Sequence, residues 1–348
     1  MDSERDNLRS ALNWTLQRDV SRAARLSAAL WPYWHEFSVL HEGRQWMGMA
    51  IGRAGSDLPA PTRAQLLTGA SVLAVSQGDY RAAPSLIDAA LAIWRELDDH
   101  HGQAIVLRQR AWIAWPQGDV ASALADFTEA VRHWRALAEP RGIAYGLNDL
   151  ALLLILTGQF EEAQPLLSDA RAICEQQDDR LGLARAIGEQ GLSAMLQGDL
   201  RTAIPLLEQS VALCRPLGTT FVLPGLQFYL GTALCLAEQP AAALTELSSA
   251  IRLQAEMGDK LGTSLTLLAF AAAAHRLGQP DRAARLCGAV INLHEQFGMA
   301  MVPTTRLIYD REVAVVRAQL GDILFETEFN RSRELTLDEA VTYALTIG

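Results

Sequence analysis

Residues 117–123 read Gln117-Gly118-Asp119-Val120-Ala121-Ser122-Ala123, and this pattern returns along the chain at a fixed interval. Counting from Gly78 to Gly118 and onward to Gly278 places a turn every 40 residues, with Glu238 in the position of one missing glycine. The six turns are Gln77-Gly78-Asp79-Tyr80, Gln117-Gly118-Asp119-Val120, Thr157-Gly158-Gln159-Phe160, Gln197-Gly198-Asp199-Leu200, Ala237-Glu238-Gln239-Pro240 and Leu277-Gly278-Gln279-Pro280. Self-similarity at such a period predicts a repeat architecture.

A second glycine position recurs at the same period, half a unit away from the turns. It is occupied by Gly102, Gly142, Gly182 and Gly262, with Val222 in the remaining place. A glycine ends a helix readily because it adopts the left-handed conformation without a Cβ penalty, and an aspartate after the turn glycine can cap the next helix. Two such interruptions per period predict two helices per unit.

Helical periodicity between these interruptions predicts six antiparallel helix pairs with helical caps at both ends. The first helices of the pairs are predicted at residues 62–76, 103–116, 143–156, 183–196, 222–236 and 263–276, and the second helices at 80–97, 120–137, 160–177, 200–217, 241–257 and 281–297. An N-terminal cap over residues 1–60 is predicted to hold helices near 2–18, 20–36 and 39–53. The pairs occupy residues 61–300, and the C-terminal cap over 301–348 is predicted to hold helices near 304–319 and 322–330. Thr336-Leu337-Asp338-Glu339 matches a capping box and predicts a last short helix.

Further positions recur inside the predicted helices. Small residues occupy two of them, which lets paired helices approach closely: Ser71, Ala111, Ala151, Gly191, Gly231 and Ala271 on the first helices, and Ala83, Ala123, Ala163, Ala203, Ala243 and Ala283 on the second. Larger core residues are predicted beside them at Leu86, Leu124, Leu166, Leu206, Leu244 and Leu286. A further position on the second helices is predicted to pack between repeats: Trp94, Trp134, Cys174, Cys214, Gln254 and His294.

Composition narrows the class of protein. The chain has 348 residues and a net charge of −10, and Lys260 is its only lysine. Without a cluster of cations it is a poor partner for nucleic acid, so direct DNA binding is not expected. No apolar run reaches the length of a membrane span and the first residues carry no signal-peptide core, which predicts a soluble, cytoplasmic protein. The preference for arginine and alanine favours a GC-rich bacterial genome.

No motif for catalysis, metal or cofactor binding stands out. The sequences His35-Glu36 and His41-Glu42 lack the second histidine of a zinc-protease motif, and Lys260 follows Asp259 where a phosphate-binding loop needs glycine. His100-His101, beside two aspartates, is interpreted as a solvated turn rather than a metal site. The expectation is therefore a protein that is not an enzyme and needs no cofactor or metal.

The turn glycine, the following aromatic or apolar residue, the alanine and the small residue of the preceding helix resemble the tetratricopeptide repeat over residues 62–297. The period of 40 is longer than that repeat's usual length of about 34 residues and falls within the range of HEAT repeats. The turn glycine and small positions favour the tetratricopeptide interpretation. The resemblance implies an all-α fold, a right-handed superhelical solenoid of antiparallel helix pairs.

The flanking segments resemble a narrower group. Residues 4–16, ERDNLRSALNWTL, with Ala29-Leu30-Trp31-Pro32-Tyr33-Trp34 and His41-Glu42-Gly43-Arg44-Gln45-Trp46, look like the segment after the ATPase module of large bacterial signal-transduction regulators. Residues 334–345, ELTLDEAVTYAL, are similar to the end of the repeat region in those proteins, which a LuxR-type helix-turn-helix sometimes follows. The resemblance implies the sensor region of such a transcriptional regulator, with ATPase and helix-turn-helix domains of the same regulator as partners.

In a tetratricopeptide superhelix the first helices line a concave groove. The repeat register predicts that this groove binds its ligand through Arg108, Trp112, Trp115, Tyr145, Asn148, Arg185, Met195 and Phe228. Arginines beside apolar side chains suit a peptide, a protein segment or an apolar small-molecule effector with a carboxylate. Trp112 and Trp115 have an alternative place in the hairpin core. The alternative function is an assembly module that self-associates or docks a partner domain without a small ligand.

Overall fold

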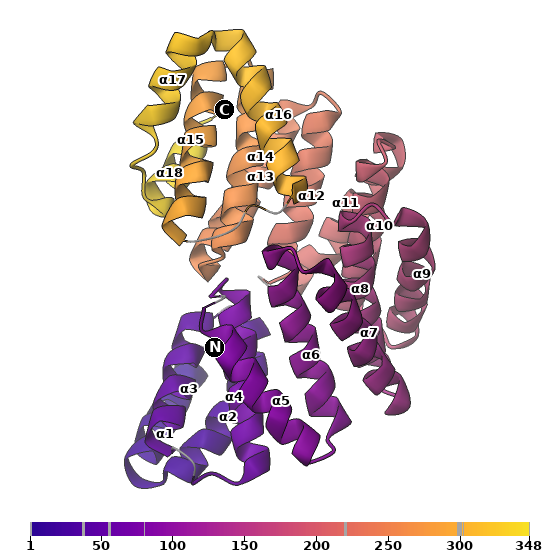
Figure 1. Ribbon diagram of the computed structural model, residues 1–348, viewed down its shortest axis with the longest axis vertical. Coiled ribbons are helices and arrows are strands. Elements are labelled where there is room, and N and C mark those ends of the chain that lie inside the picture. Colours follow the sequence, from indigo (N-terminus) through magenta and orange to yellow (C-terminus); the bar gives the residue numbers. More distant parts are fainter. Residues whose placement is uncertain are drawn as a thin grey trace. The chain divides into compact units, whose positions relative to one another are not determined.

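The computed structural model describes residues 2–36, 39–54, 57–79, 81–218, 221–297, 301 and 303–347. Every regular element in these residues is a helix (Figure 1). None of the described helices combines the length and the apolar composition that crossing a membrane requires. The predicted all-α class is confirmed.

Both helices of all six predicted pairs are present. The first helices are α4 (Ala60–Ser76), α6 (His100–Ala114), α8 (Pro140–Leu156), α10 (Arg180–Leu196), α12 (Leu223–Leu236) and α14 (Lys260–Arg276). The second helices are α5 (Ala83–Glu96), α7 (Val120–Ala136), α9 (Phe160–Gln176), α11 (Leu200–Cys214), α13 (Pro240–Met257) and α15 (Pro280–Phe297). Short 3₁₀ turns, η1 (Trp115–Gln117) and η2 (Arg215–Leu217), follow α6 and α11. Tyr80, part of the first predicted turn, lies outside the described residues.

The turn glycines adopt the left-handed conformation that the repeat pattern predicts. Gly118, Gly158 and Gly198 have φ values of 84°, 82° and 82°, and Glu238 keeps a positive φ of 57° where the glycine is missing. The backbone therefore holds the turn even with a side chain present. Asp119 caps α7 by accepting from the Ser122 N–H at 3.1 Å, as predicted.

The second glycine position is not a helix end, which corrects the prediction. Gly102, Gly182 and Gly262 lie in the first turns of α6, α10 and α14, which begin three residues earlier than predicted. Their N–H groups donate to the capping aspartates: Gly102 to Asp99 at 2.8 Å, Gly182 to Asp179 at 3.0 Å and Gly262 to Asp259 at 2.9 Å. The left-handed residues are instead those just before the caps, such as Asp98 and Asp178.

The glycine at this position makes room for the preceding second helix. A Cβ on Gly102 would collide with the Trp94 indole, and one on Gly142 with the Trp134 indole. At Gly182 it would come within 2.6 Å of the Cys174 sulfur. The predicted packing between repeats is confirmed, since these residues are buried together with Cys214, Gln254 and His294.

The small positions also meet as predicted, but the core position beside them is shifted. A Cβ on Gly191 would lie 3.3 Å from the carbonyl oxygen of Ala203, so α10 and α11 are in close backbone contact. Of the predicted core leucines, Leu244 and Leu286 are buried, whereas Leu86, Leu124, Leu166 and Leu206 are half-buried. The fully buried positions are Ile87, Phe127, Leu167, Leu207, Leu247 and Cys287. The prediction chose the edge of the buried stripe at four repeats.

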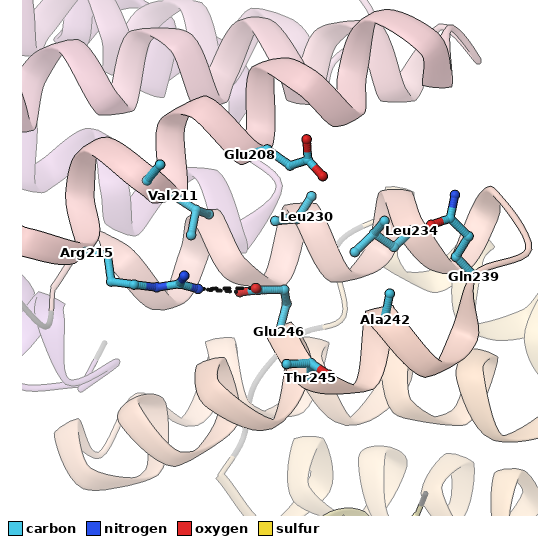
Figure 2. A pocket seen from close by; sticks show the side chains of 10 residues that line it. Glu208, Val211, Arg215, Leu230, Leu234, Gln239, Ala242, Thr245 and Glu246 are labelled. Carbon is cyan, nitrogen blue, oxygen red and sulfur yellow. Dashed lines mark hydrogen bonds and ion pairs between the residues drawn. The ribbon is translucent and has the colours of Figure 1, made fainter.

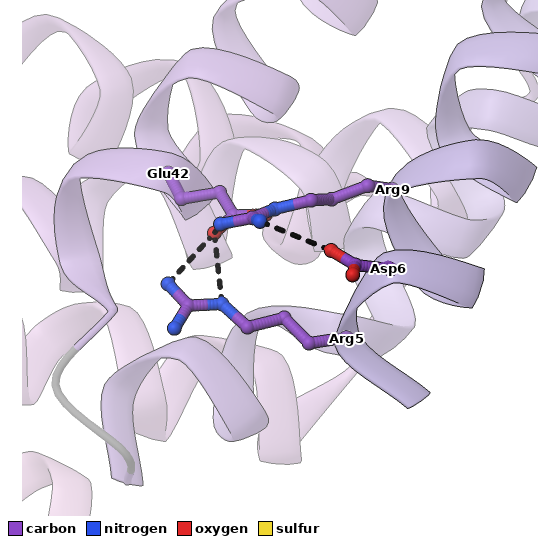
Figure 3. Close-up of polar contacts among 4 residues, drawn as sticks. All are labelled: Arg5, Asp6, Arg9 and Glu42. Carbon is purple, nitrogen blue, oxygen red and sulfur yellow. Dashed lines mark hydrogen bonds and ion pairs between the residues drawn. The ribbon is translucent and has the colours of Figure 1, made fainter. Parts of the chain in front are cut away.

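The chain divides into two compact units, and the first holds residues 1–115 and 119–146. Its N-terminal helices are α1 (Asp2–Arg18), α2 (Val20–Glu36) and α3 (Leu40–Ala54), with a core that includes Leu12, Trp34 and Met47. An ion cluster joins α1 to α3 (Figure 3): the Glu42 carboxylate accepts from Arg5 at 3.0 Å and from Arg9 at 2.8 Å. The two guanidinium groups hold the pKa of Glu42 at about 2, below its ordinary 4.5.

The second unit holds residues 116–118 and 147–348. Beyond α15 it contains α16 (Pro303–Leu320), α17 (Asp322–Arg331) and α18 (Leu337–Ala344). The predicted capping box of α18 is present, with Thr336 and Glu339 bonded reciprocally. The Tyr309 hydroxyl donates to the Cys287 carbonyl at 3.1 Å, and Phe325 of α17 is buried. These contacts fix the C-terminal helices on the last pair.

Candidate functional site

Arg108 and Trp112, two of the predicted groove residues, lie on α6 in the first unit, and both are half-buried. Arg108 lies near His35 of α2, where burial and, second to it, the Arg108 charge lower the pKa of His35 to about 4. The Trp112 ring meets Phe127 of α7 edge-on, with centroids 5.4 Å apart. One edge of Trp112 therefore packs in the hairpin, while the rest of the side chain is part-exposed.

The other two predicted residues of this unit are aromatic. Trp115 opens η1 and is half-buried. Tyr145 of α8 is also half-buried, and the Arg141 guanidinium lies over its ring at 5.6 Å from the centroid. Within the first unit, the predicted positions thus combine part-exposed aromatic rings with a half-buried arginine.

In the second unit, Asn148 and Met195 lie deeper than expected. Asn148 is fully buried on α8, and its amide donates to the Gly182 carbonyl of α10 at 3.4 Å. Met195 of α10 is buried, with 7% of its surface exposed. Asn148 thus links two neighbouring first helices in this structure, and its role as an amide that holds a ligand stays a prediction.

Arg185 is held by two carboxylates of the same unit. One amino group of its guanidinium donates to Asp149 of α8 at 2.7 Å and to Glu189 of α10 at 3.2 Å. Asp149 is fully buried, Glu189 nearly so, and the Arg185 side chain is 11% exposed. Charges that are removed from water persist only when they are paired. Arg185 is therefore the centre of a buried polar cluster.

The sequence prediction missed Asp149 and Glu189. The two residues are 40 positions apart, and the next residue at that spacing is Tyr229 of α12. Burial, with the nearby Glu189 carboxylate second, raises the pKa of Tyr229 above its ordinary value. Reading the polar residues in repeat register, as was done for glycine and alanine, would have revealed this row.

The first helices of the second unit form a continuous row. α12 contacts both α10 and α14 directly. Phe228 lies on α12, half-buried, with its ring 5.6 Å from that of Tyr229. The row thus places a part-exposed aromatic ring beside buried acidic, basic and phenolic groups. Such a mixture of an apolar surface and a few polar groups is typical of ligand sites.

A pocket of about 400 Å³ lies elsewhere in the second unit, between the second helices α11 and α13 (Figure 2). Val211 of α11 and Leu230 and Leu234 of α12 supply its apolar lining. At one end the Arg215 guanidinium donates to the Glu246 carboxylate at 3.2 and 3.3 Å. Glu208, Gln239 and Thr245 complete the polar lining. The groove prediction, which considered only first helices, did not include this pocket.

A search of the described residues for metal sites finds no group of three or more histidine, cysteine, aspartate or glutamate side chains placed to hold an ion. The two histidines at the start of α6 have other contacts. His100 stacks on His133 of α7 with centroids 4.7 Å apart, and the imidazole of His101 lies 2.7 Å from the Glu139 carboxylate.

Comparison with known proteins agrees with this geometry. Residues 62–136 and 142–215 match the family model of the tetratricopeptide repeat. The chain contains tetratricopeptide repeats. The matched segments include α4 to α7 and α8 to α11, two helix pairs each, so the preference for this repeat over HEAT is confirmed where the model matches.

Solved structures show the same fold. A Rap protein complexed with competence and sporulation factor is similar at 13% identity and a TM-score of 0.60, over 94% of this chain and 100% of that one. A tetratricopeptide repeat protein from Parabacteroides merdae is similar at 13% identity and a TM-score of 0.47, over 82% of this chain and 99% of that one. No curated protein matches the chain. The protein is therefore an all-α tetratricopeptide-repeat scaffold, an architecture that presents extended binding surfaces.

Proposed function

We propose that this chain is the non-catalytic sensor region of a bacterial transcriptional regulator, and that its first helices bind a peptide, a protein segment or a small effector. The observation that carries the proposal is the row on α8, α10 and α12, where Asp149, Arg185 and Glu189 are buried beside Phe228. Ionic groups are costly in the interior of a repeat whose other core positions are apolar, and perturbed polar clusters concentrate at functional sites.

The regulator context rests on two supports. The flanking segments resemble those of signal-transduction ATPases with LuxR-type domains, and the ion cluster of Arg5, Arg9 and Glu42 joins two of these segments. The similar Rap structure is a complex with a factor. The ATPase and helix-turn-helix partners, the cytoplasmic location and the three-part division at residues 60 and 300 belong to this proposal.

The predicted ligand contacts are retained with one change of role. Phe228, Trp112, Trp115 and Tyr145 offer part-exposed aromatic surface, and Arg108 a half-buried cation. Arg185 instead organises Asp149 and Glu189, so substituting it would disturb the scaffold as well as binding. A test of the site should therefore use Phe228, whose removal leaves no buried charge without its partner.

The experiment is native mass spectrometry of the protein as isolated from its own cells. The parent chain should carry a bound molecule, the Phe228→Ala variant should lose at least ten-fold in occupancy, and Phe329→Ala should not. Phe329 is a matched control because it is a half-buried phenylalanine of the same unit, stacked on Phe325 in α17. Equal occupancy in the two variants would remove α12 from the site.

The alternative function, an assembly module, is favoured by a different observation. Exposed apolar side chains gather on the C-terminal helices: Leu307, Ile308 and Val315 of α16, and Ile323 and Leu324 of α17. Ile323 is 84% exposed. Apolar clusters of this kind mark interaction surfaces. If assembly is the function, light scattering should show a dimer or larger species in the parent chain and a monomer in Ile323→Asp.

A further inference from the structure

The pocket on the second helices differs in chemistry from the row on the first helices. It opens between α11 and α13, above α12, where Ala212 and Ala242 leave space because their side chains are small (Figure 2). Val211, Leu230 and Leu234 provide apolar surface large enough for an aliphatic chain of several carbons. No residue of this pocket takes part in the proposed function.

The charge in the pocket is negative and only partly compensated. Glu246 is paired with Arg215 and accepts a second hydrogen bond from Gln227 at 3.0 Å. Glu208 is exposed, and no hydrogen bond or ion pair joins it to another described side chain. Figure 2 shows its carboxylate beside Leu230, on the same side of the pocket as Leu234 and Gln239. One carboxylate is thus open to an incoming cation.

This carboxylate is a feature of one repeat. The residues that stand 40 and 80 positions before Glu208 and 40 positions after it are Ser168, Thr128 and Ser248. The position of Glu246 is leucine at four of the other five repeats: Leu86, Leu166, Leu206 and Leu286. The acidic pair is therefore not part of the repeat pattern that builds the fold, and it coincides with the pocket.

We infer that this pocket binds an arginine side chain presented by a partner protein. The aliphatic part of the arginine packs on Leu230 and Leu234, and its guanidinium meets the Glu208 carboxylate beside Glu246. Arginine fits because it combines an apolar stem with a planar cation that binds carboxylates in a fork. The net charge of −10 on the chain favours the approach of a basic partner.

The test is a methyl NMR titration of the full chain, labelled at leucine and valine, with N-acetyl-arginine amide as the probe. The matched probe is N-acetyl-citrulline amide, which has nearly the same shape and no charge. The Leu230, Leu234 and Val211 methyl signals should shift saturably with arginine and at least three-fold more weakly with citrulline. In Glu208→Gln the affinity for arginine should fall about two- to five-fold, the range of an exposed ion pair.

The control variant is Glu256→Gln, which removes an exposed carboxylate from α13 away from the pocket. It should bind arginine as the parent does. Equal shifts with arginine and citrulline, no saturable shift, or an equal loss in both variants would each overturn the inference, the last by showing a general attraction to the acidic surface. Because no first-helix contact is probed, failure here leaves the effector site unaffected.

Discussion

Two ion clusters, one in each unit, use the same groups in opposite proportion. In the first unit, Glu42 lies between two arginines, Arg5 and Arg9, and joins α1 to α3 (Figure 3). In the second unit, Arg185 lies between two carboxylates, Asp149 and Glu189, and joins α8 to α10. The side chains of Arg5 and Arg9 are 37% and 45% exposed, whereas Arg185 is 11% exposed.

Burial, more than the number of bonds, separates the two clusters in energy. Water screens the exposed arginines of the first cluster, and ion pairs of that kind contribute little. In the second cluster all three groups have lost water, so removing one partner leaves an uncompensated charge in the interior. The first cluster is therefore expected to be a modest, solvent-sensitive fastening, and the second a structural requirement of the row that we propose binds the effector.

The largest effect is expected from Arg185→Ala. Leaving Asp149 and Glu189 without this guanidinium should lower the free energy of unfolding by about 3–5 kcal/mol. Urea denaturation measures the loss, and hydrogen exchange should locate it in α8 and α10. Arg171→Ala is the control, because this exposed arginine of α9 pairs only with Glu175 on its own helix. A loss below about 1 kcal/mol would contradict the view that burial sets the energy.

Neutralising the first cluster should cost less and should depend on pH. Glu42→Gln is expected to lower the free energy of unfolding by about 1 kcal/mol at neutral pH, given the exposure of its arginines. The pKa of Glu42 is about 2 in the folded chain against an ordinary 4.5, so its contribution is complete above pH 4.5 and is lost as the pH falls toward 2. The difference between parent and variant, measured by urea denaturation, should shrink from pH 4.5 downward. A difference that stays constant over that range would contradict this assignment.

Salt should sharpen the contrast further. Raising sodium chloride from about 0.05 to about 1 M shortens the screening length from more than 10 Å to about 3 Å. The loss caused by Glu42→Gln should fall by at least half, while the loss caused by Arg185→Ala should change little. Parallel denaturation series at the two salt concentrations measure both, and equal salt sensitivity would erase the distinction drawn between the clusters.

The smallest effect is expected within the first cluster itself. The hydrogen bond from Arg9 is the main cause of the lowered pKa of Glu42, and Arg5 adds a second contribution. In Arg9→Ala the pKa of Glu42 should rise but stay below its ordinary value, because Arg5 remains. NMR titration of the Glu42 side-chain carbon checks this. A return to the ordinary pKa would mean that Arg5 contributes nothing.

The repeat could be predicted from sequence because its signals are local. A turn glycine at Gly118, a capping aspartate at Asp119 and an alanine at Ala123 each act within one helix or one turn, so the spacing determined the helix pairs. The glycine at Gly102 was misplaced because its reason is not local: it yields space to Trp94 on the preceding helix. Sequence alone does not distinguish a glycine required by φ from one required by a neighbour.

The site was harder to predict than the fold. The register correctly assigned Arg185 and Phe228 to first helices, but it could not show that Asp149 and Glu189 surround Arg185, because that depends on how α8 and α10 pack. The pocket beside Glu208 was missed since its lining comes from three helices, with alanines whose importance lies in the space they leave. Charges and cavities are tertiary properties that periodicity does not report.

Hydrogen–deuterium exchange tests the central claim, recognition by the first helices, most directly. The chain as isolated from its own cells would be compared with the same chain after unfolding, removal of bound molecules and refolding. Removing the ligand should increase exchange in α8, α10 and α12 and leave α9, α11 and α13 unchanged. An increase confined to the second helices or to α16 and α17 would contradict the account and place recognition on another surface.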